Sequence, residues 1–142
     1  MLAFLTPFTH GTMGIRVLAL ALVSASAMAN PCSVINLNLS ENRKKILAPV
    51  LARKMTLESV EVLESYRYGG WQIIYVDTIV SDGAFLFFKG NPLKMQYKTF
   101  WAGEAFSYEE QIVKTWALKN AKGIPEKLAS CFAWHVTQNR SQ

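Results

Sequence analysis

Two adjacent glycines, Gly69 and Gly70, separate two stretches that are rich in aromatic and β-branched residues. A glycine pair in this setting is typical of a two-residue β-hairpin, because both turn positions take a positive φ. The pattern therefore predicts antiparallel strands over residues 59–68 and 71–80. The first strand should place Val60, Val62, Tyr66 and Tyr68 on one side.

Further strands follow the first hairpin. The three-residue segment 81–83, Ser-Asp-Gly, predicts a second hairpin with Gly83 in the left-handed conformation. The apolar run 84–89 predicts a strand that is covered on both faces, and 94–101 predicts a fourth strand after a turn. Because every connection is short, the economical topology is a four-stranded antiparallel meander.

A helical pattern precedes this sheet in the sequence. Ser40 is a suitable N-cap for a helix over residues 41–55, in which the apolar residues recur at helical spacing. Pro49 falls inside this segment, where it removes a backbone donor. A kinked helix or two short helices are therefore expected here.

Two further helices are predicted after the sheet. Ser107 and Glu110 have the spacing of a capping box, and Gly123 is a suitable end for the helix that follows. Pro125 suits the first turn of a last helix over 124–138. The expected core positions of these helices are Ile112, Val113, Trp116, Leu118, Leu128, Cys131, Phe132 and His135. The order of elements predicts an α+β domain, residues 30–142, with the two C-terminal helices packed on one side of the sheet.

The N-terminus has the layout of a secretory signal peptide. Arg16 precedes an uncharged apolar stretch, and small residues end at Ala29, after which cleavage is expected. The apolar stretch 17–23 is much shorter than the roughly 20 residues that a membrane-spanning helix needs. Met13 is an alternative start that gives the same mature protein. The mature chain is therefore expected to be periplasmic or secreted, without a transmembrane segment.

Only two cysteines, Cys32 and Cys131, occur in the chain, one near each end of the mature part. An even cysteine count in an exported protein favours a disulfide. Removal of Arg16 with the leader lowers the net charge from +5 to +4, and the remaining basic residues form no dense stripe. Nucleic-acid binding is therefore not expected, since such proteins carry a basic stripe and a recognisable motif.

The first hairpin gives the main candidate site. A two-residue turn pairs Glu64 with Tyr75 and Val62 with Asp77, which makes the two acids diagonal neighbours on one face. Two carboxylates could act as an acid/base pair or hold a polar ligand. Both acids could also lie at the solvent-exposed end of the sheet face and have no chemical role. The aromatic residues expected to line a binding face are Tyr66, Tyr68, Trp71 and Tyr75, with Trp101 as a separate anchor.

His135 is the only histidine in the mature chain. Zinc usually takes three or four ligands from Cys, His and carboxylates, so neither a metal nor another cofactor is expected. Two function classes remain. The favoured one is a non-catalytic binding, inhibitor, immunity-type or accessory module that recognises a protein or glycan in the bacterial envelope. The alternative is a small envelope hydrolase that uses Glu64, Asp77 and His135.

Overall fold

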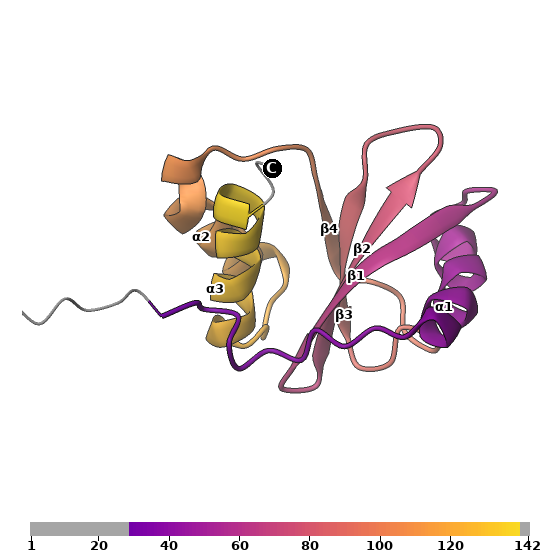
Figure 1. Ribbon diagram of the computed structural model, residues 1–142, viewed down its shortest axis with the longest axis horizontal. Coiled ribbons are helices and arrows are strands. Elements are labelled where there is room, and N and C mark those ends of the chain that lie inside the picture. The colour runs from indigo at the N-terminus through magenta and orange to yellow at the C-terminus, as the bar shows by residue number, and fades with distance from the viewer. Residues whose placement is uncertain (1–28, 140–142) are drawn as a thin grey trace, which may run out of the picture.

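A computed structural model describes residues 29–139 of the 142-residue chain. A four-stranded sheet lies between helix α1 (Glu41–Lys54) on one face and helices α2 (Glu110–Asn120) and α3 (Glu126–Trp134) on the other (Figure 1). The predicted α+β class and the position of the two C-terminal helices are confirmed. The predicted leader, apart from Ala29, lies outside the described residues, as does Met13.

The sheet is the predicted antiparallel meander in the order β1-β2-β3-β4. Its strands are β1 (Val60–Tyr68), β2 (Trp71–Thr78), β3 (Ala84–Lys89) and β4 (Thr99–Ala102). Gly69 and Gly70 have φ values of 60° and 78°, which confirms the two-residue hairpin. Lys94 to Lys98 do not belong to β4, which is therefore shorter than the sequence predicted.

The predicted register holds near the hairpin and is wrong farther along the two strands. Glu64 pairs with Tyr75 as expected, but Val62 pairs with Val76 and leaves Leu63 as an extra residue in a β-bulge. The bulge turns Val62 toward the α1 side of the sheet, where it is 2% exposed beside Val76. Asp77 consequently faces Glu61.

The second hairpin also differs from its prediction. The loop contains residues 79–83, and Gly83 does not have a positive φ. Thr78 organises this loop, because its hydroxyl donates to the Ser81 carbonyl at 2.6 Å and accepts from the Ser81 N–H at 3.1 Å. A Cβ at Gly83 would collide with the Tyr75 ring, so the glycine allows a close approach between side chain and backbone.

Helix α1 covers one face of the sheet through Leu47 and Leu51, both fully buried. They pack with Val62, Ile74, Val76, Ala84, Leu86 and Phe88. The helix runs continuously through Pro49, so the alternative of two short helices is wrong. Ser40 caps it as predicted, because the Ser40 hydroxyl accepts from the Arg43 N–H at 3.1 Å.

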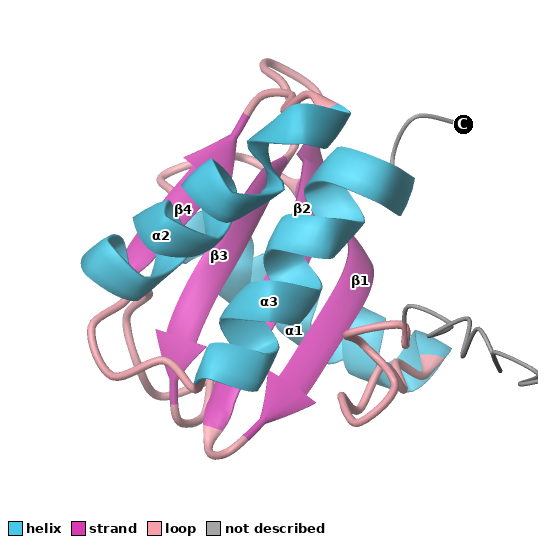
Figure 2. Ribbon diagram, turned by 90° about the vertical axis from the view of Figure 1, so that its left-hand side faces the viewer, coloured by secondary structure: helices cyan, strands magenta, loops and turns pink. Residues whose placement is uncertain are grey.

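The larger core lies between the sheet and helices α2 and α3, which lie side by side over the sheet (Figure 2). Its central rings are Phe85, Phe87 and Phe132, each at most 1% exposed. The predicted capping box is off by one residue, because the Glu109 carboxylate accepts from the Phe106 N–H at 2.8 Å. Ile112 is 65% exposed, so its predicted place in the core is wrong.

An exposed ion pair joins the two C-terminal helices. The Lys114 ammonium lies 2.8 Å from the Glu126 carboxylate. The hydrogen bond from Lys114, and then its positive charge, lower the pKa of Glu126 from its ordinary value. A lowered carboxyl pKa stabilises the fold at pH values above the unfolded pKa, and this contribution disappears as the pH falls through the folded value. Solvent screens the pair strongly, so its contribution is small.

The predicted disulfide between Cys32 and Cys131 is present, with a Cα–Cα distance of 4.6 Å. It connects the segment that precedes α1, residues 29–40, to the middle of α3. We call this segment the N-terminal lead. From this bond the lead passes the edge of β1, where Asn36 and Arg67 form an isolated bridge, and continues to α1 (Figure 1). No helix within residues 29–139 is long and apolar enough to cross a membrane.

Candidate functional site

The aromatic residues predicted to line a binding face share one face of the sheet, but α3 covers that face. Tyr66 and Trp71 are only 5% and 4% exposed and belong to the core between the sheet and the helices. Tyr75 stacks on Phe85 with ring centroids 4.5 Å apart. These side chains therefore hold the helical layer against the sheet.

Tyr68 and Trp101 lie at the margins of this core. The Tyr68 ring is half-buried, and the Lys127 ammonium lies 5.9 Å from its centroid. Trp101 makes an edge-to-face contact with Trp116, with ring centroids 4.8 Å apart. The Trp101 indole N–H is buried and has no hydrogen-bond partner among the described residues. Most of the Trp101 ring therefore serves packing between β4 and α2.

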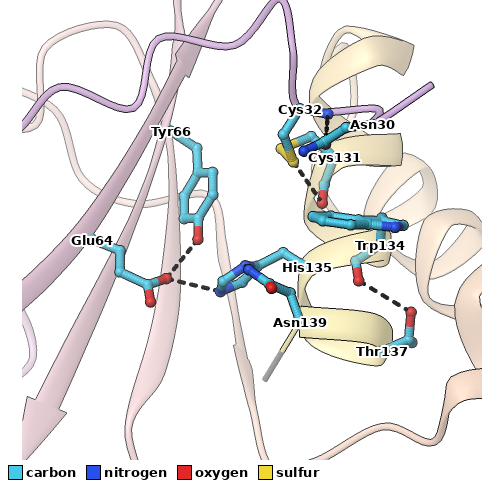
Figure 3. The surroundings of a disulfide bond; sticks show 9 residues. All are labelled: Asn30, Cys32, Glu64, Tyr66, Cys131, Trp134, His135, Thr137 and Asn139. Atoms are coloured by element: carbon cyan, nitrogen blue, oxygen red, sulfur yellow. Dashed lines mark hydrogen bonds and ion pairs between the residues drawn. A yellow bond between two sulfur atoms is a disulfide. The ribbon is translucent and has the colours of Figure 1, made fainter. Parts of the chain in front are cut away.

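A cluster of polar side chains lies between β1 and the end of α3 (Figure 3). The Tyr66 hydroxyl donates to Glu64 Oε2 at 2.6 Å, and His135 Nε2 lies 2.9 Å from the same oxygen. The Glu64 side chain is 37% exposed, whereas that of His135 is 10% exposed. The Glu64–Tyr66–His135 cluster thus ties a strand to the C-terminal segment, close to the disulfide.

The surroundings of His135 decide what this cluster can do chemically. Asn139 Nδ2 lies 3.4 Å from His135 Nδ1, while Nε2 faces Glu64, so both ring nitrogens have a neighbour. A general base needs one nitrogen within hydrogen-bond reach of a substrate proton. Substrate could reach Nδ1 only if Asn139 moved away. In this arrangement the imidazole connects β1 to the π-helical turn His135–Asn139.

Asp77, the third residue of the predicted acid–histidine set, lies outside this cluster. It is exposed, faces Glu61 across the strands, and its carboxylate accepts from the Thr78 N–H at 2.9 Å. No ion pair joins Asp77 to His135 within the described part of the chain. The structure therefore brings Glu64 and His135 together and leaves Asp77 apart.

An isosteric substitution that removes the charge of Glu64 tests the structural role of the cluster. We expect Glu64→Gln to lower the free energy of unfolding by about 1 kcal/mol, because an amide is a weaker acceptor for the Tyr66 hydroxyl and His135 than a carboxylate. Glu61→Gln, on the exposed part of the same strand, should change it by less than about 0.5 kcal/mol. Urea unfolding measures both. Equal effects of the two substitutions would contradict this role.

An exposed apolar surface lies elsewhere, at the start of α2. Phe106, Tyr108 and Ile112 are 66%, 79% and 65% exposed. Phe106 and Tyr108 stack with centroids 5.5 Å apart and planes at 5°. Tyr108 and Ile112 are four residues apart in the helical stretch 107–120, so they share a face. We call these three residues the aromatic surface.

The backbone beneath the aromatic surface is held in place by two side chains. The Glu109 carboxylate accepts from the Phe106 N–H, and the Gln138 amide donates to the Ser107 carbonyl at 2.8 Å. The second bond fastens the segment to the turn that follows α3. Exposed aromatic rings on a fixed backbone lose little conformational freedom on binding. The aromatic surface is therefore preorganised for a contact.

Sequence reasoning missed the aromatic surface because it assigned Ile112 to the core. One signal was available. Phe106 and Tyr108 stand among three acids, Glu104, Glu109 and Glu110. Aromatic residues are enriched at protein interfaces relative to the rest of the surface, so rings in a charged segment could have been read as contact residues.

Neither a metal site nor a comparison with known proteins indicates a function. Among residues 29–139, no group of three or more His, Cys, Asp or Glu side chains is placed to hold a metal ion. Comparison with known proteins finds no protein-family model, no curated protein and no solved structure that matches this chain.

Proposed function

We propose that this protein is an exported, non-catalytic module of the bacterial envelope that binds a basic protein partner through its aromatic surface. The observation that carries the proposal is the exposed stack of Phe106 on Tyr108 above a fixed backbone. Aromatic rings dominate the energetic centres of protein interfaces, since they bury a large area and lose few rotamers. Side chains this exposed contribute little to the stability of the fold itself.

The charge around the aromatic surface indicates a basic partner. Glu104, Glu109 and Glu110 surround the two rings in the sequence, and no lysine or arginine occurs between Lys98 and Lys114. The chain as a whole carries a net charge of +5, so this acidic segment is a local exception. Complementary charge at the rim of an interface accelerates association and disfavours partners of the wrong sign.

Export is supported by the leader pattern and by the disulfide. The bond between Cys32 and Cys131 is of the kind that forms and persists in oxidising compartments. The leader pattern that ends at Ala29 provides the route out of the cytosol. A partner would then be a periplasmic, surface or secreted protein.

A pair of double variants tests the proposed function. Oxidised protein is used to capture binding partners from an envelope extract of its own host. We expect Phe106→Ala/Tyr108→Ala to reduce capture of the specific partner by about tenfold or more, because both rings belong to the contact. Ile79→Ala/Val80→Ala is the matched control, since these side chains are 88% and 76% exposed in a different loop.

The control must retain capture, and the capture must weaken as the salt concentration rises, because the contact is expected to be charge-assisted. Equal losses in the two double variants, or retention only of polysaccharide, would contradict a protein contact at the aromatic surface.

One observation favours the alternative of a small envelope hydrolase, namely the 2.9 Å contact between Glu64 and His135. A hydrolase would also need an open ring nitrogen and a third group, whereas Asn139 stands at Nδ1 and Asp77 lies apart. The binding function requires no such rearrangement, so we retain it.

A further inference from the structure

Two adjoining hollows lie on the α1 side of the sheet, where the N-terminal lead passes the first hairpin. One has a volume of about 400 Å³ and lies beside Gly69 and Gly70. The other, of about 290 Å³, lies beside Ser40 and Arg43 at the start of α1. Both are lined by Arg67 and Gln72, so they adjoin, and we call the two hollows together the groove. This groove and the aromatic surface lie on opposite faces of the sheet.

The floor of the groove contains buried polar side chains with unused hydrogen-bonding capacity. Ser65 and Gln72 are only 3% and 6% exposed, and the Gln72 amide donates to the Ser65 hydroxyl at 2.8 Å. This is the one side-chain hydrogen bond that either residue makes among the described residues. Neither residue has a fully buried polar side-chain atom without a partner, so their remaining donors and acceptors are open to water or to a ligand in the groove.

The walls of the groove are positively charged. Arg67 is exposed and Arg43 is half-buried, and no aspartate or glutamate belongs to the described residues that line either hollow. The Arg67 guanidinium reaches the Asn38 carbonyl at 3.4 Å, which leaves most of its donors open. Helix α1, 14 residues long, begins at the groove and adds the positive end of its dipole. The nearby Glu41 is paired with Lys44 at 2.9 Å.

From this combination we infer that the groove binds a small polyhydroxylated oxyanion, such as a sugar phosphate or a sugar acid. The two guanidinium groups and the helix N-terminus take the oxyanion, since arginine matches phosphate and carboxylate oxygens with paired donors. Ser65, Gln72 and the amide side chains of Asn36 and Asn38 suit hydroxyl groups, because they both donate and accept. The volumes fit one sugar-sized molecule. This inference does not depend on the proposed protein partner.

Isothermal titration calorimetry of the oxidised protein tests the inference with three probes: glucose 6-phosphate, glucuronate and glucose. We expect saturable binding of glucose 6-phosphate, glucuronate or both, with glucose at least about tenfold weaker because it lacks the oxyanion. Binding of only one acid identifies the phosphoryl or the carboxyl group as the preferred oxyanion.

Three single substitutions distinguish the groove from general charge attraction. Arg43→Ala and Arg67→Ala should each weaken binding by about tenfold or more. Arg53→Ala removes the same charge from the last turn of the same helix, outside both hollows, and should leave binding within about twofold. Absence of saturable binding by both acids at about 10 mM would overturn the inference. So would equal binding of glucose, or an Arg53→Ala effect as large as that of Arg67→Ala.

Discussion

The double variant Cys32→Ser/Cys131→Ser is expected to lose about 4 kcal/mol of unfolding free energy. The bond closes a loop with a sequence separation of 99 residues, and in the chain-entropy model such a loop restricts the unfolded chain by about 4–5 kcal/mol. A domain of this size has a total stability of about 5–15 kcal/mol, so the loss is a large share. The thermal unfolding midpoint should fall by about 15–20 °C.

Reduction of the wild-type protein provides the control, since it breaks the same bond without changing a side chain. Scanning calorimetry with reductant should give a midpoint close to that of the double variant. A loss of less than about 1 kcal/mol would show that the N-terminal lead contributes little constraint to the unfolded chain, contrary to the expectation.

Phe132→Ala is the single substitution with the largest expected effect on stability. Phe132 is 1% exposed, and its ring centroid lies 5.2 Å from that of Phe85 and 4.9 Å from that of Phe87. Truncation removes buried area and leaves a cavity between α3 and the sheet, which costs about 3–5 kcal/mol. Urea unfolding at 25 °C measures the change through the midpoint at unchanged slope.

Phe106→Ala is the matched control for this substitution. It removes an equal ring from a site that is 66% exposed, so the free energy of unfolding should change by less than about 0.5 kcal/mol. Similar losses at Phe106 and Phe132 would contradict the assignment of Phe106 to a contact surface and of Phe132 to the core.

The parts of the fold that the sequence predicted are governed by local chemistry. The Gly69-Gly70 turn, the Ser40 cap and the buried face of α3 each follow from residues close together in the chain. Short connections then restrict the topology to a meander, and the cysteine count in an exported chain predicts the disulfide. These features require no knowledge of tertiary contacts.

The errors arose where tertiary packing decides the backbone. The bulge at Leu63 exists because Val62 and Val76 are both buried under α1, and a regular ladder would have placed Val62 opposite Asp77. Gly83 is required by the nearby Tyr75 ring and not by its own φ. Neither cause is visible in the local sequence.

In the candidate sites, too, residue types were predictable from the sequence, whereas their spatial arrangement depends on tertiary packing. Sequence reasoning selected Glu64 and His135 from their residue types, but only the packing of α3 on β1 places them 2.9 Å apart. It expected Tyr66 and Trp71 on a binding face, and the helical layer covers them. The groove near Arg67 could not be predicted, because its walls come from the lead, the hairpin and α1 together.

Export is the claim on which the disulfide, the compartment and the proposed partner all depend, and intact-mass analysis of the protein from its native host tests it most directly. We expect a chain that begins at Asn30 and whose two cysteines become accessible to alkylation only after reduction. A chain that retains Arg16 and is alkylated at both Cys32 and Cys131 without reductant would contradict it.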